Sequence, residues 1–147
     1  MGRSSINNST NNALVIDTHV LLWTIFEPEQ LKEDIKKHIA LAQENNQLFI
    51  SSISLWEIAM LYFKKRISIY EPIKAFLESI VNIHGAIIKD ISPEVAAESI
   101  LLADGFHGDP ADRIIVATTK VHGAVLLTRD HKILSWADSC HIQYLQA

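Results

Sequence analysis

The chain alternates between short apolar runs and longer stretches in which apolar residues recur with a helical period. A continuous apolar run of a few residues is typical of a strand buried on both faces of a sheet. The stretch at 30–44 instead places Leu31, Ile35 and Ile39 on one face of an amphipathic helix. Strands are expected over residues 13–16, 48–50, 86–88, 124–128 and 141–145.

Residues that begin or end helices mark the stretches between these runs. Pro110 suits the first turn of a helix and Gly123 the residue after one, because proline has a preset φ and glycine accepts a positive φ. Ser52 or Ser54 is expected to cap the helix after the second strand. Helices are expected over residues 19–26, 30–44, 52–66, 72–83, 92–104, 109–122 and 131–136.

Short apolar strands that alternate with helices predict an α/β fold. Successive strands then pair in parallel, and right-handed crossovers place helices on both faces of the sheet. We expect a three-layer α/β/α sandwich with a central parallel sheet of four to five strands, in which 13–16 is central and 141–145 lies at an edge. Ligands bind such sheets at the carboxyl ends of the strands, where the strand order reverses.

Length and composition are typical of one domain. The 147 residues suffice for a single core, and we expect residues 13–147 to form one domain after a polar, flexible tail at 1–12. No apolar run approaches the roughly 18 to 20 residues that a membrane span requires. Cys140 is the only cysteine, so no disulfide can form within the chain, and a cytoplasmic location is expected.

The charge balance at first argues against a nucleic-acid partner. The 13 Lys and Arg against 17 Asp and Glu give a net charge of −4, whereas phosphate-binding proteins usually carry a basic excess. Setting aside four acids that could form a site leaves the remainder neutral. Lys64, Lys65 and Arg66 form the only tight basic cluster, which suits either a substrate backbone or a solvated helix end.

The four acids adjoin the predicted strand ends. Asp17 directly follows the first strand, and Asp130 lies just past the strand at 124–128. Glu57 and Asp112 fall in the first turns of two predicted helices, where the helix dipole tolerates negative charge. Because the carboxyl ends of parallel strands meet at one edge of a sheet, we expect the four carboxylates to share a crevice.

Carboxylates gathered in one crevice predict a bound cation. Two unit charges about 4 Å apart repel each other by roughly 4 kcal/mol at an effective dielectric constant of 20. With oxygen ligands only, no cysteine pair and no HExxH helix, the sequence favours Mg²⁺ over zinc, with Mn²⁺ as a substitute. Such a site can polarise a phosphate and lower the pKa of a bound water.

Three of the acids also have structural interpretations. Ser54 and Glu57 match the S-x-x-E capping box, so Glu57 could simply cap its helix. Asp109 is the natural N-cap of the helix at 109–122, and Asp112 three residues later could be its capping partner, so one of the pair is expected to be structural. We assign the cap to Asp109, which leaves Asp112 free to turn into the crevice. Asp130 could equally be a turn or cap residue.

Asp17 is the acid that a structural role explains least. A carboxylate directly after a buried strand, without an adjacent basic residue, is costly unless something binds it. Hydroxyls nearby could orient a ligand or water, guanidinium groups could steady developing charge, and a loop histidine could contact substrate. These secondary candidates, each with an ordinary structural alternative, are Thr18, Thr128, Arg113, Arg129 and His107.

The three tryptophans stand at helical positions. Trp23, Trp56 and Trp136 are therefore expected in the core rather than as base-stacking platforms.

In this order and spacing, four segments make the chain resemble the PIN-domain nucleases, in particular the VapC-type toxins of bacterial toxin–antitoxin pairs. Each segment is weak alone, and together they span nearly everything after the tail. The segments are LVIDTH at 14–19, SSISLWEI at 51–58, HGDPADRIIVAT at 107–118 and LTRD at 127–130.

The resemblance implies magnesium ligands, an activity and partners. It implies that Asp17, Glu57, Asp112 and Asp130 hold Mg²⁺ and that RNA is cleaved endonucleolytically by metal-activated water. It also implies a homodimer inhibited by a small antitoxin protein. Thr119 stands where relatives often carry Ala, a departure that touches none of the acids.

Two other functions compete with this interpretation. An aspartyl-nucleophile phosphatase would use Asp17 to attack phosphorus, but such enzymes have a second Asp two residues later, where this chain has His19. A catalytically silent partner-binding module could keep the fold without turnover. The complete set of acids argues against that module, since a degenerate site is expected to lose one of them.

Overall fold

The computed structural model describes residues 13–102, 106, 108–137 and 142–147. The predictions for the tail at 1–12, for His107 and for Cys140 lie outside these residues. Within them, one parallel sheet has the strand order β3-β2-β1-β4-β5. The strands are β1 (Leu14–Ile16), β2 (Leu48–Ser51), β3 (Ala86–Lys89), β4 (Val125–Thr128) and β5 (Gln143–Gln146).

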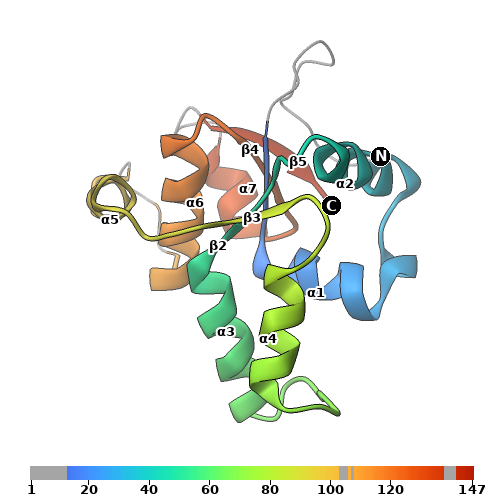
Figure 1. The fold of residues 1–147 in the computed structure, drawn as a ribbon. Coiled ribbons are helices and arrows are strands. Elements are labelled where there is room, and N and C mark those ends of the chain that lie inside the picture. The colour runs from blue at the N-terminus through green and yellow to red at the C-terminus, as the bar shows by residue number, and fades with distance from the viewer. Residues whose placement is uncertain (1–12, 103–105, 107, 138–141) are drawn as a thin grey trace.

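Helices connect these strands, as the apolar periodicity predicts (Figure 1). A 3₁₀ turn at Pro28–Gln30 precedes the second helix, so the helix expected over 30–44 begins only at Glu33. The helices are α1 (Thr18–Phe26), α2 (Glu33–Glu44), α3 (Ser52–Phe63), α4 (Ile73–Val81), α5 (Pro93–Ile100), α6 (Pro110–Val121) and α7 (His131–Ala137).

The predicted three-layer α/β/α sandwich is confirmed. Successive side chains of a strand point to opposite faces, and in β1 Leu14 and Ile16 join one apolar cluster whereas Val15 joins the other. The first cluster contains side chains of α1, α2 and α4, and the second contains side chains of α6 and α7. β1 lies in the centre of the sheet and β5 at an edge, both as expected.

The strand order reverses at β1. From β1 the sheet continues to β2 and β3 on one side and to β4 and β5 on the other, so the carboxyl ends of β1 and β4 adjoin each other. α3 starts directly after β2 and packs against α1, α4 and α6. The start of α6, the body of α3 and the end of β1 therefore surround one point.

Several other helix limits also differ from the sequence prediction, since α3 ends at Phe63 and α4 at Val81, each earlier than expected. Ser51, the last residue of β2, caps α3 by accepting a hydrogen bond from the Ile53 amide, so the caps expected at Ser52 or Ser54 are wrong. α5 ends at Ile100, earlier than expected. No helix within the described ranges combines the length and the apolar character needed to cross a bilayer.

Candidate active site

Asp17 is a buried carboxylate at the carboxyl end of β1. Its side chain is only 4% exposed and does not cap α1, although the residue stands at the N-cap position. Its Oδ2 accepts a hydrogen bond of 2.7 Å from the Thr128 hydroxyl at the end of β4. Burial raises the pKa of Asp17, and the Thr128 hydrogen bond offsets part of that rise.

Glu57 reaches the same region from α3 and is held by hydroxyl groups. The Thr18 hydroxyl donates to Glu57 Oε1 at 2.5 Å. Ser54 Oγ lies 2.8 Å from Thr18 Oγ1, so Ser54 is placed to donate to Thr18 in turn. Since Ser51 is the N-cap, the S-x-x-E pattern lies inside the helix, and the capping-box interpretation of Glu57 is wrong.

Asp109 and Asp112 stand at the start of α6. Asp109 Oδ1 accepts a hydrogen bond of 2.9 Å from the Asp112 amide, which confirms Asp109 as the N-cap. Asp112 is half-buried, and its side chain is not used in capping. The prediction that Asp109 caps α6 and leaves the Asp112 side chain free of that role is therefore confirmed.

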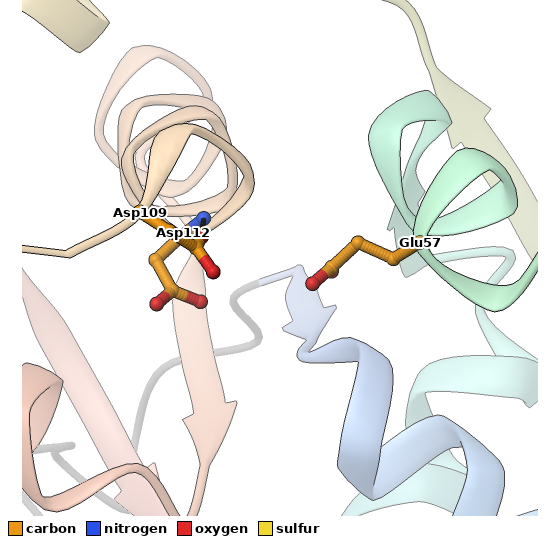
Figure 2. Close-up of side chains that lie close together, drawn as sticks. All are labelled: Glu57, Asp109 and Asp112. Atoms are coloured by element: carbon orange, nitrogen blue, oxygen red, sulfur yellow. Dashed lines mark hydrogen bonds between the residues drawn. The ribbon is translucent and has the colours of Figure 1, made fainter. Parts of the chain in front are cut away.

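Three carboxylates from two helices meet across the end of β1 (Figure 2). Oxygen atoms of Glu57, Asp109 and Asp112 all lie within 4.8 Å of one another. Asp17 and Asp130 lie outside this close group, but their negative charges still raise the pKa of Asp112 within it. Burial, followed by the charges of Asp109, Asp17, Asp130 and Glu57, raises the pKa of Asp112 to about 7.

Asp130 has a structural role as well as a place near the other acids. Its Oδ1 accepts a hydrogen bond of 2.8 Å from the Lys132 amide at the start of α7. Its own amide donates to the Thr128 hydroxyl at 3.0 Å. Thr128 thus links Asp17 to the backbone of Asp130. The turn interpretation of Asp130 is correct for its Oδ1 atom, which binds the Lys132 amide.

The donor set fits a hard divalent cation. All the close ligand atoms are carboxylate oxygens, which Mg²⁺ prefers over the nitrogen and sulfur ligands typical of zinc. Burial also raises the pKa of Glu57, despite the Thr18 hydrogen bond that lowers it. Glu57 and Asp112 in the close group, and Asp17 near it, all have raised pKa values, so a nearby positive charge would favour their ionised forms.

The two arginine candidates differ in what they contact. Arg113 donates from Nε to the Ser99 carbonyl at 2.9 Å and from Nη1 to the Phe106 carbonyl at 3.0 Å. It therefore braces the segment before α6, and we do not assign it to charge stabilisation. The guanidinium of Arg129 lies 4.1 Å from the ring centroid of half-buried Trp23.

An open pocket beside the acids contains residues that the sequence did not single out as a site. This pocket, called here the α3 pocket, has a volume of about 330 Å³, and Glu57 and Asp109 line one part of it. Trp56 lines it too and is 57% exposed, so the prediction of a core position is wrong for Trp56. The same prediction is confirmed for Trp136, which is 6% exposed.

Comparisons with known proteins agree on one family. Residues 14–138 match the family model described as the PIN domain. Over 122 residues the chain is 35% identical to Ribonuclease VapC22 of Mycobacterium tuberculosis, an alignment that covers 83% of this chain and 90% of that protein.

Solved structures share the fold at lower identity. The DNA-bound VapBC complex of Salmonella typhimurium matches with a TM-score of 0.67 and 20% identity, over 92% of this chain and 98% of that one. VapBC2 of Rickettsia felis, bound to a promoter DNA fragment, matches with a TM-score of 0.67 and 17% identity, over 91% and 98%. At this identity the two matches support the architecture alone.

Proposed function

Because this chain belongs to the PIN-domain family, we propose that it is a magnesium-dependent endoribonuclease and the toxin of a toxin–antitoxin pair. One observation carries the proposal. Glu57, Asp109 and Asp112 bring carboxylate oxygens within 4.8 Å of one another, and the pKa of Asp112 is raised to about 7. A relative that is 35% identical over most of its length is a ribonuclease.

The acids divide into direct ligands and supporting groups in this proposal. Asp17 and Asp112 would hold Mg²⁺ directly, and Glu57 and Asp130 would act as supporting acids, with Glu57 and Asp112 the two of these four that lie in the close carboxylate group. Mn²⁺ is the expected substitute, since it prefers the same oxygen ligands. When bound, the ion supplies Lewis-acid polarisation of the phosphate and a lowered pKa for water.

The remaining polar groups orient these acids. The Thr128 hydroxyl fixes Asp17, and the Thr18 hydroxyl fixes Glu57, so that neither side chain has to reorganise when substrate binds. Asp109 keeps one oxygen on the helix cap and has the other free to face the cluster. Arg129 is the cation proposed to steady negative charge developing on the phosphate.

We also propose the partners that accompany this activity in the family. The two structural neighbours are VapBC assemblies, which favours a small antitoxin protein that covers the acid cluster. A homodimer and a cytoplasmic location complete the proposal. Co-expression with the protein encoded beside this chain should give a complex without ribonuclease activity.

Cleavage of RNA with and without Mg²⁺ tests the proposed function. The purified chain should cleave RNA in Mg²⁺ and lose activity in EDTA, and the Asp17→Asn variant should be inactive while retaining its circular dichroism spectrum. Asp34→Asn, an exposed change on α2, is the matched control and should leave cleavage unchanged. Undiminished cleavage by the Asp17→Asn variant would overturn the assignment.

A further inference from the structure

The α3 pocket joins acidic, aromatic and basic side chains in one hollow. Its lining includes Glu57 and Asp109 from the acid cluster, and Trp56 beside them. It also includes Lys64 and Arg66, the two outer members of the basic cluster seen in the sequence. At about 330 Å³ the pocket lies within the roughly 300–1,000 Å³ typical of small-molecule sites.

The geometry of α3 explains why the basic residues lie beside the acids. Glu57 and Lys64 are seven residues apart, two helical turns, so they share one face of the helix, with Met60 between them. A rise of about 1.5 Å per residue separates them by roughly 10 Å along the helix axis. Lys64 therefore lies on the same side of α3 as the acid cluster but too far along the helix to pair with Glu57.

The end of α3 directs Lys65 and Arg66 to different sides. The Lys65 amide donates to the Tyr62 carbonyl and the Arg66 amide to the Leu61 carbonyl, the two hydrogen bonds of a Schellman motif. Lys65 has the positive φ of 60° that this motif requires. As a result Arg66 turns back to the α3 pocket, whereas Lys65 lines a separate pocket with Tyr70.

The side chains of Lys64 and Arg66 face solvent at the pocket. Lys64 and Arg66 are exposed, and within the part of the chain that the structure describes they form no ion pair. Trp56 exposes 57% of a large aromatic side chain on the same face of the molecule. Exposed cations and an exposed aromatic ring in one pocket are the elements with which proteins bind single-stranded nucleic acid.

We propose that the α3 pocket binds one unpaired nucleotide of the RNA next to the phosphodiester that is cleaved. Trp56 stacks on its base, and Lys64 and Arg66 bind the flanking phosphates. The inference rests on the proposed function, because the acid cluster at the pocket's edge marks where cleavage occurs. A base stacked on Trp56 inside the pocket is not paired, so the RNA is expected to be unpaired at this one position.

An acidic peptide is the other occupant that these cations could attract. It would bring carboxylates beside Glu57 and Asp109, as RNA brings phosphates, but it has no base to stack on Trp56. The aromatic ring therefore favours RNA. An acidic peptide as the occupant predicts that none of the changes below alters RNA binding.

Binding of a labelled single-stranded RNA tests the proposal. The affinity of a 12-nucleotide oligouridine would be measured by fluorescence anisotropy at several salt concentrations, in the Asp17→Asn background so that the RNA stays intact. The same RNA in a duplex serves as a second probe. The variants are Lys64→Ala, Arg66→Ala and Trp56→Ala, and the matched control is Lys65→Ala, which removes the same charge from the same cluster but outside the pocket.

The three pocket variants should differ in a way that identifies each contact. Lys64→Ala and Arg66→Ala should each weaken binding by up to about fivefold and reduce the slope of log K against log salt by about 0.7, the value for one phosphate contact on a single strand. Trp56→Ala should weaken binding by at least about fivefold with the slope unchanged, and Trp56→Phe should restore most of it. Lys65→Ala should leave the slope unchanged, and the duplex should bind more weakly than the single strand.

Equal effects of Lys64→Ala and Lys65→Ala would overturn the proposal, since they would indicate diffuse charge rather than a phosphate site. Unchanged RNA binding in the Trp56, Lys64 and Arg66 variants would overturn it in favour of a protein partner. Cleavage by the chain with its native Asp17 separates this failure from failure of the proposed function. RNA cleavage with unaltered KM in the Lys64→Ala variant refutes the pocket alone, whereas absence of any cleavage refutes the nuclease.

Discussion

α3 and α6 both deliver acids to the end of β1, but they hold them differently. On α3, Glu57 is fixed by neutral hydroxyl groups, Thr18 directly and Ser54 through Thr18. On α6, the carboxylate of Asp112 has an oxygen atom within 4.8 Å of an oxygen atom of Asp109, so another carboxylate lies close to it. Burial and like charge act together there and raise the pKa of Asp112 to about 7.

The difference shows where the site depends on a cation. Glu57 already has a hydrogen-bond donor, the Thr18 hydroxyl, so the fold itself orients its side chain. Asp112 has burial and four like charges working against its ionisation, and only a positive charge can relieve all of them. The α6 side is therefore the part of the site that metal binding should change most.

The largest expected effect comes from removing the crowded acid. Asp112→Asn should lower kcat/KM for RNA cleavage by roughly 10²–10³-fold, the range found when one preorganised electrostatic group is removed. The same change should raise the melting temperature of the metal-free protein at pH 8, because it removes a charge that the folded state disfavours. Cleavage assays and thermal melts in EDTA measure the two effects.

A variant that loses activity and stability together would contradict this interpretation of Asp112. That result would indicate that the side chain supports the fold rather than the site. Asp34→Asn, which removes an exposed acid in the first turn of α2, controls for the change in net charge.

A smaller effect is expected on the α3 side of the comparison. Thr18→Val keeps the shape of a fully buried side chain but removes the hydroxyl that orients Glu57. We expect a loss of roughly 10- to 100-fold in metal affinity or activity, as for other outer-shell partners of metal ligands. Thr18→Ser retains the hydroxyl and should recover most of that loss, whereas equal losses in the two variants would assign the effect to packing.

The smallest expected effect is a change of stability with pH in the metal-free protein. Asp112 ionises with a pKa of 3.8 in a model peptide and about 7 in the folded chain, so the folded state binds its proton more tightly. The contribution of Asp112 to the free energy of unfolding is fully present below pH 3.8, where the carboxyl is protonated in both states. It is lost as the pH rises through about 7, where the folded chain must also ionise the group. The pKa values of Asp17 and Glu57 are raised in the same direction and add to the trend.

Thermal melts in EDTA between pH 5 and pH 8 measure this trend, because this interval brackets the Asp112 pKa of about 7. The melting temperature should fall as the pH rises, and Asp112→Asn should flatten the curve. Mg²⁺ should restore stability at the alkaline end and do little at the acidic end. A melting temperature that rises steadily over the same interval in EDTA would contradict the crowding of charge at α6.

The sequence predicted the sheet and the position of Asp17 because both follow from burial. Continuous apolar runs have few alternatives to central strands, and a carboxylate directly after such a run has few structural uses. Asp109 was also correctly identified as a cap, since Asp-Pro at a helix start is a strong local signal.

The sequence could not predict features that depend on how elements join. β2 runs into α3 without a loop, so its last residue, Ser51, is also the cap, and the S-x-x-E pattern at 54–57 lies inside the helix. Likewise, the sequence made Arg113 a candidate for steadying developing charge, but its side chain donates to the Ser99 and Phe106 carbonyls.

The exposure of Trp56 has a similar cause. A tryptophan at a helical position usually packs in the core, but α3 presents Glu57 to the acid cluster and its neighbour Trp56 to the open α3 pocket. The signals for that pocket in the sequence were the basic cluster at 64–66 and the spacing of Glu57, Met60 and Lys64 along one helix face.

Calorimetric titration of Mg²⁺ at pH 6, in two buffers with different ionisation enthalpies, tests the central claim most directly. Asp112 has a pKa of about 7 without metal, so binding should release about one proton per ion at this pH. We predict that binding and proton release are both lost in Asp17→Asn and Asp112→Asn. Absence of Mg²⁺ binding to the unchanged chain, or binding that survives both substitutions, would contradict a magnesium site at this acid cluster.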